Sequence, residues 1–181
     1  MSNEAQSFPG VMVSSTFTDL KEHRAVVLEA LRKSDLHEVA MENSTAKAMT
    51  VIEASLAMVQ KASAYICVIG RRYGQTPEDA VRNPKRVSVT ELEFDEAQRR
   101  KVPVLLFVMG PDHPLKEADF ETDAGKREKL VAFRERAKGC GVWAEFNSLE
   151  EFVKLVCPAV ADLPGRRQRD EAVEKAREFV A

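Results

Sequence analysis

Several features that would assign this chain of 181 residues to a class directly are scarce or absent. It has only three cysteines, widely spaced and without a Cys-x-x-Cys pair, so neither a disulfide framework nor a structural zinc site is expected. The three histidines also lack the spacing of metal ligands, and we expect no metal. The first of them, His23, falls on a predicted helix, where we expect it at the surface.

Long apolar runs and an excess of one charge are missing as well. No run is long enough to cross a bilayer, and a formal net charge of −2 gives no broad basic surface for nucleic acid. The polar start, residues 1–9, lacks the pattern of a signal peptide and is expected to be disordered. We therefore expect a cytoplasmic protein that binds neither membranes nor nucleic acid.

Three glycine-containing motifs are also absent. The sequence has no Gly-x-x-x-x-Gly-Lys-Ser/Thr loop and no Gly-x-Gly-x-x-Gly, which removes support for ATP hydrolysis and for dinucleotide-dependent reduction. It has no Gly-x-Ser-x-Gly either, so the nucleophile elbow of the α/β-hydrolases is not expected.

What is present is an alternation of apolar runs with amphipathic helices. This order is typical of βαβ units, and it predicts an α/β, flavodoxin-like, doubly wound parallel sheet of about five strands with helices on both faces. We place this domain at residues 10–163. A charged helix over 164–181 either closes the domain or begins a linker to a further domain, and the linker is favoured. The expected strands are 10–15, 37–40, 64–69, 102–108 and 142–146.

Polar residues follow the ends of the predicted strands, where such folds bind their ligands. Ser14, Ser15 and Thr16 end the first strand and enter a helix, whose first N–H groups can hold a phosphate or a carboxylate. Ordinary helix capping is the alternative, because Asp19 follows Thr16 by three residues. Glu42 follows the second expected strand.

The segment Gly70-Arg-Arg-Tyr-Gly74 follows the most apolar strand. A nucleotide could stack on Tyr73 and place a phosphate against Arg72. The alternative is a solvated turn in which Tyr73 packs against the edge of the sheet.

One glutamate lies on the apolar side of a predicted helix over 88–100. At 100° per residue, Val89, Leu92 and Ala97 define the inward stripe, and Glu93 falls inside it, whereas Glu91 points towards solvent. A buried, unpaired carboxylate is costly, so Glu93 should be paired, protonated or lining a cleft. The basic residues that could pair with it nearby in the sequence are Arg71, Arg72 and Arg86.

Four segments in a fixed order resemble a TIR-like family of unknown function. They are 13–24 (VSSTFTDLKEHR), 41–42 (ME), 69–74 (IGRRYG) and 90–94 (TELEF), and the resemblance covers roughly residues 10 to 110. Members of that family sit at the N-terminus of signalling ATPases of the NACHT or NB-ARC (STAND) type. The family is similar to TIR domains and, more distantly, to nucleoside deoxyribosyltransferases.

The transferases carry Thr-x-x-Glu-x-x-x-Ala before a strand that begins Gly-Lys-Pro-Val. The chain has Thr90, Glu93 and Ala97 at this spacing, followed by Lys101-Val-Pro-Val. It lacks the glycine before Lys101 and the tryptophan that is common near the acid in TIR helices. The match selects Glu93 rather than Glu91.

The resemblance implies cleavage of the N-glycosidic bond of NAD⁺, which would be a substrate rather than a cofactor. Glu93 would be the catalytic carboxylate beside an oxocarbenium-like ribose, as in glycosidases. Asp19 and Arg24 are expected as a helix cap and a helix-surface group. The residues expected to hold the nucleotide are Ser14, Ser15, Thr16, Glu42, Gly70, Arg72 and Tyr73.

Two other functions stay open at this point. The domain could be a noncatalytic self-association module of a STAND-type signalling protein, with Glu93 in a salt bridge. Thirdly, it could be a deoxyribosyltransferase-like enzyme that exchanges bases on nucleosides and needs no pyrophosphate. Self-association is also expected of the glycohydrolase, because TIR-like sites are commonly completed by a neighbouring copy.

Overall fold

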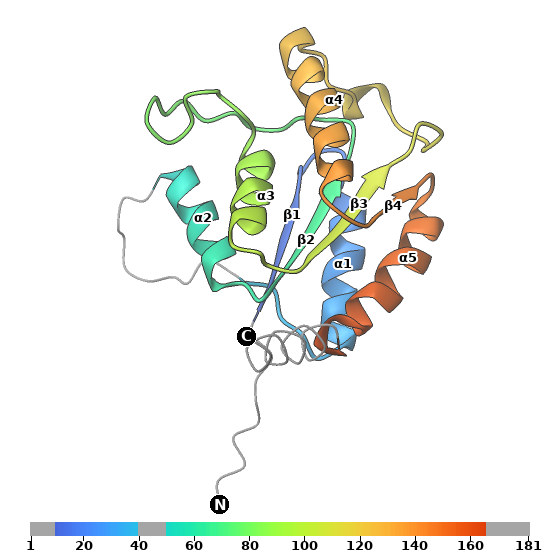
Figure 1. Ribbon diagram of the computed structural model, residues 1–181. Helices are drawn as coiled ribbons and strands as arrows, with labels where there is room; N and C mark the ends of the chain where they lie inside the picture. Colours follow the sequence, from blue (N-terminus) through green and yellow to red (C-terminus); the bar gives the residue numbers. More distant parts are fainter. Residues whose placement is uncertain (1–9, 40–49, 166–181) are drawn as a thin grey trace, which may run out of the picture.

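The computed structural model describes residues 10–39 and 50–165 of the chain, and every structural statement below concerns these residues. Their core is one parallel sheet with the strand order β1-β2-β3-β4 (Figure 1). The strands are β1 (Val11–Ser15), β2 (Ala64–Ile69), β3 (Val104–Met109) and β4 (Trp143–Phe146).

Helices cover both faces of this sheet, as predicted (Figure 1). The helices α1 (Lys21–Lys33) and α5 (Leu149–Ala161) pack on one face. The opposite face is covered by α2 (Val51–Lys61), α3 (Val89–Arg99) and α4 (Ala124–Gly139). A short 3-10 helix, η1 (Glu117–Asp119), lies between β3 and α4. The arrangement is a flavodoxin-like doubly wound fold, so the predicted fold class is confirmed.

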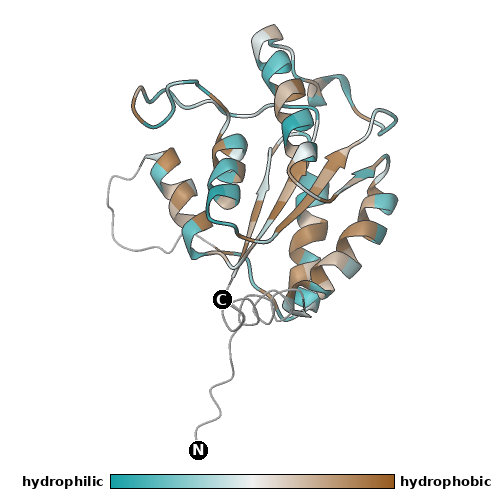
Figure 2. Cartoon of the chain, viewed as in Figure 1, coloured by the Kyte–Doolittle hydropathy of each residue, from teal (hydrophilic) through white to brown (hydrophobic). Residues whose placement is uncertain are grey.

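The central strand shows why the sequence adopts this layering. All six residues of β2 are buried, and they alternate between the two faces. Ala64, Ile66 and Val68 join the cluster under α1 and α5, whereas Tyr65, Cys67 and Ile69 join the cluster on the opposite face. Figure 2 shows largely brown central strands and helices that mix teal and brown, as expected of amphipathic helices around a buried sheet.

The predicted count of five strands differs from the four that the structure describes. The expected second strand, 37–40, makes only an isolated parallel bridge between Glu38 and Val11. Val11 donates to the carbonyl of His37 at 2.8 Å, and Val39 donates to the carbonyl of Val11 at 2.9 Å. The segment therefore lies on the free edge of β1, in the place of the missing strand. Within the described residues, the pairing does not extend beyond this bridge.

The prediction that His23 lies at the surface is wrong. His23 is only 3% exposed, and its ring packs between Phe146 and Phe152 from β4 and α5. Its Nε2 lies 3.1 Å from Nε2 of His113. Burial, and secondarily the nearby His113, lowers the pKa of His23 to about 4. The helical pattern could not show this, because α5 covers the side of α1 that carries His23.

Two sequence predictions concern the ends of the chain. The expected disordered segment 1–9 lies outside the described residues, as does the expected helix 164–181 apart from its first two residues. Within 10–39 and 50–165, no helix combines the length and apolarity that a membrane span requires.

Candidate functional site

A cleft of about 560 Å³ opens beside the carboxyl end of β1. Its walls come from β1 and the turn after it, the loop after β2, and one side each of α2 and α3. Doubly wound sheets bind ligands at this edge, where the crossover helices leave the strand ends uncovered. The polar and charged residues that line it are Ser14, Ser15, Thr16, Thr18, Arg24, Glu38, Arg72, Gln75, Thr90, Glu93, Glu121 and Lys126.

Glu93 occupies the inner side of α3 and lines this cleft. Its side chain is largely buried, at 6% residue exposure, and it accepts a hydrogen bond from the hydroxyl of Ser14. Burial raises the pKa of Glu93, while hydrogen bonds from Ser14 and Ser55 and the charge of Arg24 act in the opposite direction.

The three arginines that could have paired with Glu93 bind elsewhere. Arg71 donates to the carbonyl of Gly110, Arg72 donates to the carbonyl of Ala118, and Arg86 pairs with Glu78. The described part of the chain offers Glu93 no ion pair within 4.0 Å. The carboxylate is therefore held by hydroxyl groups and faces the cleft.

The prediction that Glu91 faces solvent is wrong. Glu91 is buried, and it accepts hydrogen bonds from the Tyr73 hydroxyl at 2.5 Å and from Arg136 Nη2 at 2.7 Å. The periodicity of α3 correctly places Glu91 away from Glu93. The side it faces is nevertheless covered by α4 and by the loop after β2, which no pattern within α3 can show.

Tyr73 does not lie in the cleft. Its ring belongs to the core cluster under α3 and α4 and is 2% exposed, so a nucleotide has no face on which to stack. Burial and the carboxylate of Glu91 raise the pKa of Tyr73 well above its usual range. The alternative, that Tyr73 packs against the sheet, describes its position.

Asp19 joins the turn after β1 to the loop after β2. Its Oδ2 accepts the main-chain N–H groups of Arg71 at 2.7 Å and Arg72 at 3.1 Å, and its Oδ1 accepts the hydroxyl of Thr16. A Cβ on Gly70 would lie 2.2 Å from Oδ2 of Asp19, so a glycine is required for this close approach.

The prediction that Asp19 caps a helix is therefore wrong, whereas the nucleotide-binding role of Gly70 stays a prediction. Asp19 is not a helix cap, because α1 begins at Lys21 and its N-cap residue, Leu20, has no side-chain cap. Gly70 packs against Asp19 and does not line the cleft. A hydroxyl followed three residues later by an acid does not distinguish a local helix cap from a contact between loops.

Ser14, Ser15 and Thr16 run along one wall of the cleft, and their role in ligand binding stays a prediction. Ser14 is bonded to Glu93. The hydroxyl of Ser15 is buried and finds no hydrogen-bond partner in the part of the chain that the structure describes. Thr16 lies against Gly74, whose positive φ of 87° and contact with Thr16 Cγ2 both favour glycine.

Arg72 is the member of the Gly70–Gly74 segment that reaches the cleft with its charge. Its Nη1 donates to the carbonyl of Ala118 at 2.7 Å. Glu42, the remaining predicted nucleotide ligand, lies outside the described residues.

Four charged residues of the cleft were missed or given another role. Arg24, expected on the helix surface, donates to the carbonyl of Val13 at 3.0 Å and pairs with Glu38. Glu121 reaches the cleft from the segment between η1 and α4, and Lys126 reaches it from the first turn of α4. Lys126 donates to the carbonyl of Gly74, 52 positions earlier, so no local pattern points to it.

Phe17 is the exposed aromatic residue of the cleft. It is 73% exposed and stands among Ser and Thr residues at the end of β1. An apolar ring in such a polar turn is a sequence feature that could have marked it as a binding residue.

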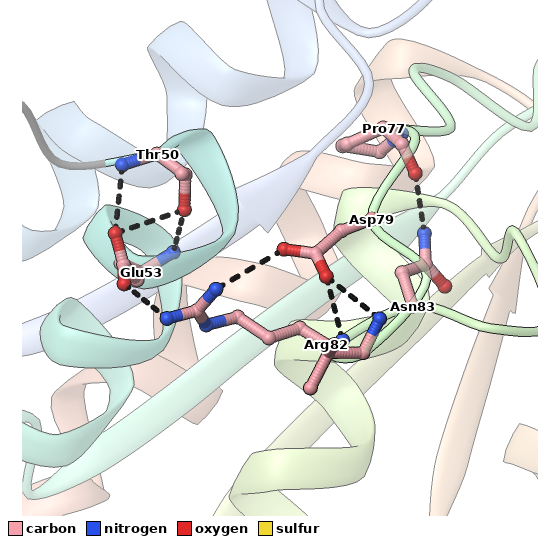
Figure 3. Close-up of polar contacts among 7 residues, drawn as sticks. Thr50, Glu53, Pro77, Asp79, Arg82 and Asn83 are labelled. Atoms are coloured by element: carbon pink, nitrogen blue, oxygen red, sulfur yellow. Dashed lines mark hydrogen bonds and ion pairs between the residues drawn. The ribbon is translucent and has the colours of Figure 1, made fainter.

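The loop between β2 and α3 is fastened to the N-terminus of α2 (Figure 3). Arg82 links Glu53 of α2, at 2.5 Å, to Asp79 of the loop, at 3.3 Å. Asn83 closes the loop on itself by donating to the carbonyls of Pro77 and Val87, both at 2.9 Å. Because α2 and α3 each form part of the cleft wall, these contacts hold the two sides of the cleft together.

Fold and site together define an α/β domain with a polar cleft at the carboxyl edge of its sheet, organised around a buried carboxylate. No group of three or more His, Cys, Asp or Glu side chains suited to a metal occurs among residues 10–39 and 50–165. The sequence profile of the DUF4062 family, a domain of unknown function, matches residues 10–160, so the chain belongs to that family. No curated protein sequence matches the chain.

Proposed function

We propose that this domain binds NAD⁺ in the cleft and hydrolyses the N-glycosidic bond between ribose and nicotinamide, with Glu93 as the catalytic carboxylate. Water adds to the anomeric carbon while the bond to nicotinamide breaks. The products are ADP-ribose, nicotinamide and a proton. The observation that carries the proposal is a buried carboxylate in an open cleft without a cationic partner among the described residues.

The chemistry of this bond fits a lone carboxylate. The nicotinamide ring is already cationic, so it leaves as a neutral molecule without an acid catalyst. The developing charge lies on the ribose, and an anion fixed beside it stabilises that charge most strongly where water is scarce. The hydroxyl of Ser14 orients one oxygen of Glu93, and no cation within 4.0 Å neutralises the carboxylate in the described structure.

The same proposal includes a signalling role. A TIR-like relationship of the DUF4062 family would make this domain an immune or signalling effector attached to a STAND-type ATPase. Its activity would then rise with self-association, because a neighbouring copy could complete an open cleft. We therefore expect low activity from dilute, isolated domains, in which no neighbouring copy completes the cleft.

The test compares nicotinamide release from NAD⁺ by the wild-type chain, by Glu93→Gln and by Glu96→Gln. Glu96 lies on the same helix, pairs with the exposed Arg99 at 2.7 Å and does not line the cleft. The control therefore changes the same chemical group outside the cleft. The assay is run at high protein concentration with a crowding agent. We expect release by the wild type and by Glu96→Gln, and loss of release in Glu93→Gln.

The other outcomes separate the competing functions. Equal rates in all three proteins would remove Glu93 from the reaction. No release by any of them, with dimerisation detected by light scattering, would favour a noncatalytic self-association module. Base exchange on free nucleosides, without any need for the pyrophosphate, would favour a deoxyribosyltransferase-like enzyme.

A further inference from the structure

Two cations of the cleft have only neutral partners. Arg72 donates to the carbonyl of Ala118 at 2.7 Å, and Lys126 donates to the carbonyl of Gly74 at 3.1 Å. Neither forms an ion pair with another described residue, whereas Arg24, on another part of the cleft wall, is paired with Glu38. A carbonyl leaves the positive charge uncompensated, so both side chains can still bind an anion.

The remaining acid on this side of the cleft is engaged with the main chain. Glu121 lines the cleft, but its carboxylate accepts the N–H groups of Tyr73 at 3.1 Å and Asp123 at 3.3 Å. These neutral donors hold two loops to the carboxylate but leave its charge in place, so two cations and one anion give this side of the cleft a net positive charge.

Both cations are held by segments that contact the turn after β1. The main chain of Arg72 is held by Asp19, which also accepts the hydroxyl of Thr16. Lys126 binds the carbonyl of Gly74, and Gly74 lies against the Thr16 side chain. Both cations line the cleft, and the segments that hold them meet the turn at its Thr16 end.

Glu93 lies at the other end of the same three-residue wall. It is bonded to Ser14, and the Cα atoms of Ser14 and Thr16 lie at most about 7 Å apart, since two residues of extended chain span no more than that. This spacing suits a ribose with its anomeric carbon near Glu93 and a phosphate on its C5.

We propose that Arg72 and Lys126 form a phosphate subsite, and that the cleft selects ribosyl 5-phosphates over the corresponding unphosphorylated sugars and nucleosides. The position of the ribose rests on the proposed function, because it places the anomeric carbon at Glu93. The phosphate subsite rests on the two cations alone. The adenosine half of a dinucleotide would add less to binding than this first phosphate.

The test measures binding of ribose 5-phosphate, ribose and inorganic phosphate to the full chain by ligand-detected NMR. None of these contains a nicotinamide bond, so binding is observed without turnover. We expect ribose 5-phosphate to bind at least about 10-fold more tightly than either fragment, because a charge-assisted hydrogen bond contributes on that scale. Equal binding of ribose and ribose 5-phosphate, or of inorganic phosphate and ribose 5-phosphate, would overturn the proposal.

Lys126→Met is the informative variant, and Lys129→Met is its matched control. Lys129 lies one turn further along α4 and also donates to carbonyls, those of Lys85 and Arg86, but it does not line the cleft. We expect Lys126→Met to weaken ribose 5-phosphate binding about 10-fold or more and Lys129→Met to leave it unchanged. Equal effects of the two variants would contradict the subsite, and matched melting temperatures show that both variants are folded.

This result is separable from the outcome of the nicotinamide assay. Binding that depends on Lys126 in a chain that releases no nicotinamide would retain the subsite and remove the glycohydrolase. Nicotinamide release that is unaffected by Lys126→Met would retain the glycohydrolase and remove the subsite.

Discussion

The contact between Asp19 and the loop after β2 gives the most quantitative prediction. Asp19→Ala removes the acceptor of two N–H groups, those of Arg71 and Arg72, at a residue that is 8% exposed. Each buried donor left without a partner costs about 1–3 kcal/mol, so the variant should lose about 2–6 kcal/mol of unfolding free energy. Urea denaturation followed by circular dichroism measures this loss. A change below about 1 kcal/mol would refute the reasoning, since that is the scale of an ordinary surface substitution.

Asp19→Asn is the matched control. The amide oxygen can accept both N–H groups, and the amide nitrogen can donate to the hydroxyl of Thr16, so every partner is retained. Burial raises the pKa of Asp19, which means that its ionisation lowers stability as the pH rises past the ordinary carboxyl range. We therefore expect Asp19→Asn to be neutral or slightly stabilising at neutral pH.

Gly70→Ala tests the same contact from the other side. Its Cβ would lie 2.2 Å from Oδ2 of Asp19, and relieving such a clash typically costs about 1–3 kcal/mol. In the Asp19→Ala background the clashing oxygen is gone, so Gly70→Ala should cost at least about 1 kcal/mol less than in the wild type. Additivity of the two changes within about 0.5 kcal/mol would show that they do not interact.

Three further predictions concern buried polar groups. Burial raises the pKa of Glu93, so its ionisation disfavours folding as the pH rises. Glu93→Gln should therefore raise the melting temperature at neutral pH by a few degrees, since each kcal/mol of stability shifts it by ~2–4 °C. Thermal scans that include Glu96→Gln as a control measure this shift. Tyr73→Phe leaves Glu91 without one donor and should lower the unfolding free energy in urea by about 1–2 kcal/mol, while nicotinamide release continues. An unfolding free energy equal to that of the wild type would contradict the bond. The pKa of His23 is lowered to about 4, so the folded state loses stability as the pH falls from the ordinary histidine value of 6.5 towards 4. In acid titrations, His23→Leu should show a smaller loss of unfolding free energy over this pH range.

The fold class could be predicted because it depends on patterns of apolar residues within single strands and helices. The run Ala64–Ile69 is apolar throughout, and the helices around it have apolar stripes of the right period, so alternation of strand and helix was sufficient. The segment 37–40 forms a bridge rather than the expected strand, and a short polar segment carries almost no pattern that could distinguish the two. Only its pairing with β1 shows that it lies at the sheet edge.

The site was predictable in part. The helical face separated Glu93 from Glu91, and the turn after β1 supplied Ser14, because both depend on residues close together in the chain. The burial of Glu91 depends on Arg136 from α4, and the contact of Lys126 with Gly74 spans 52 positions. Such contacts are set by packing between elements, which the spacing of residues within one element does not encode.

The most direct test of the central claim is the rate of nicotinamide release from NAD⁺ by equal, high concentrations of the wild-type chain and of Glu93→Gln. The account predicts release with ADP-ribose in equal amounts from the wild type, and a loss of at least about 100-fold in Glu93→Gln, the scale for removing one electrostatic stabiliser of a transition state. Rates that agree within a few fold, in a variant whose melting temperature shows that it is folded, would contradict it.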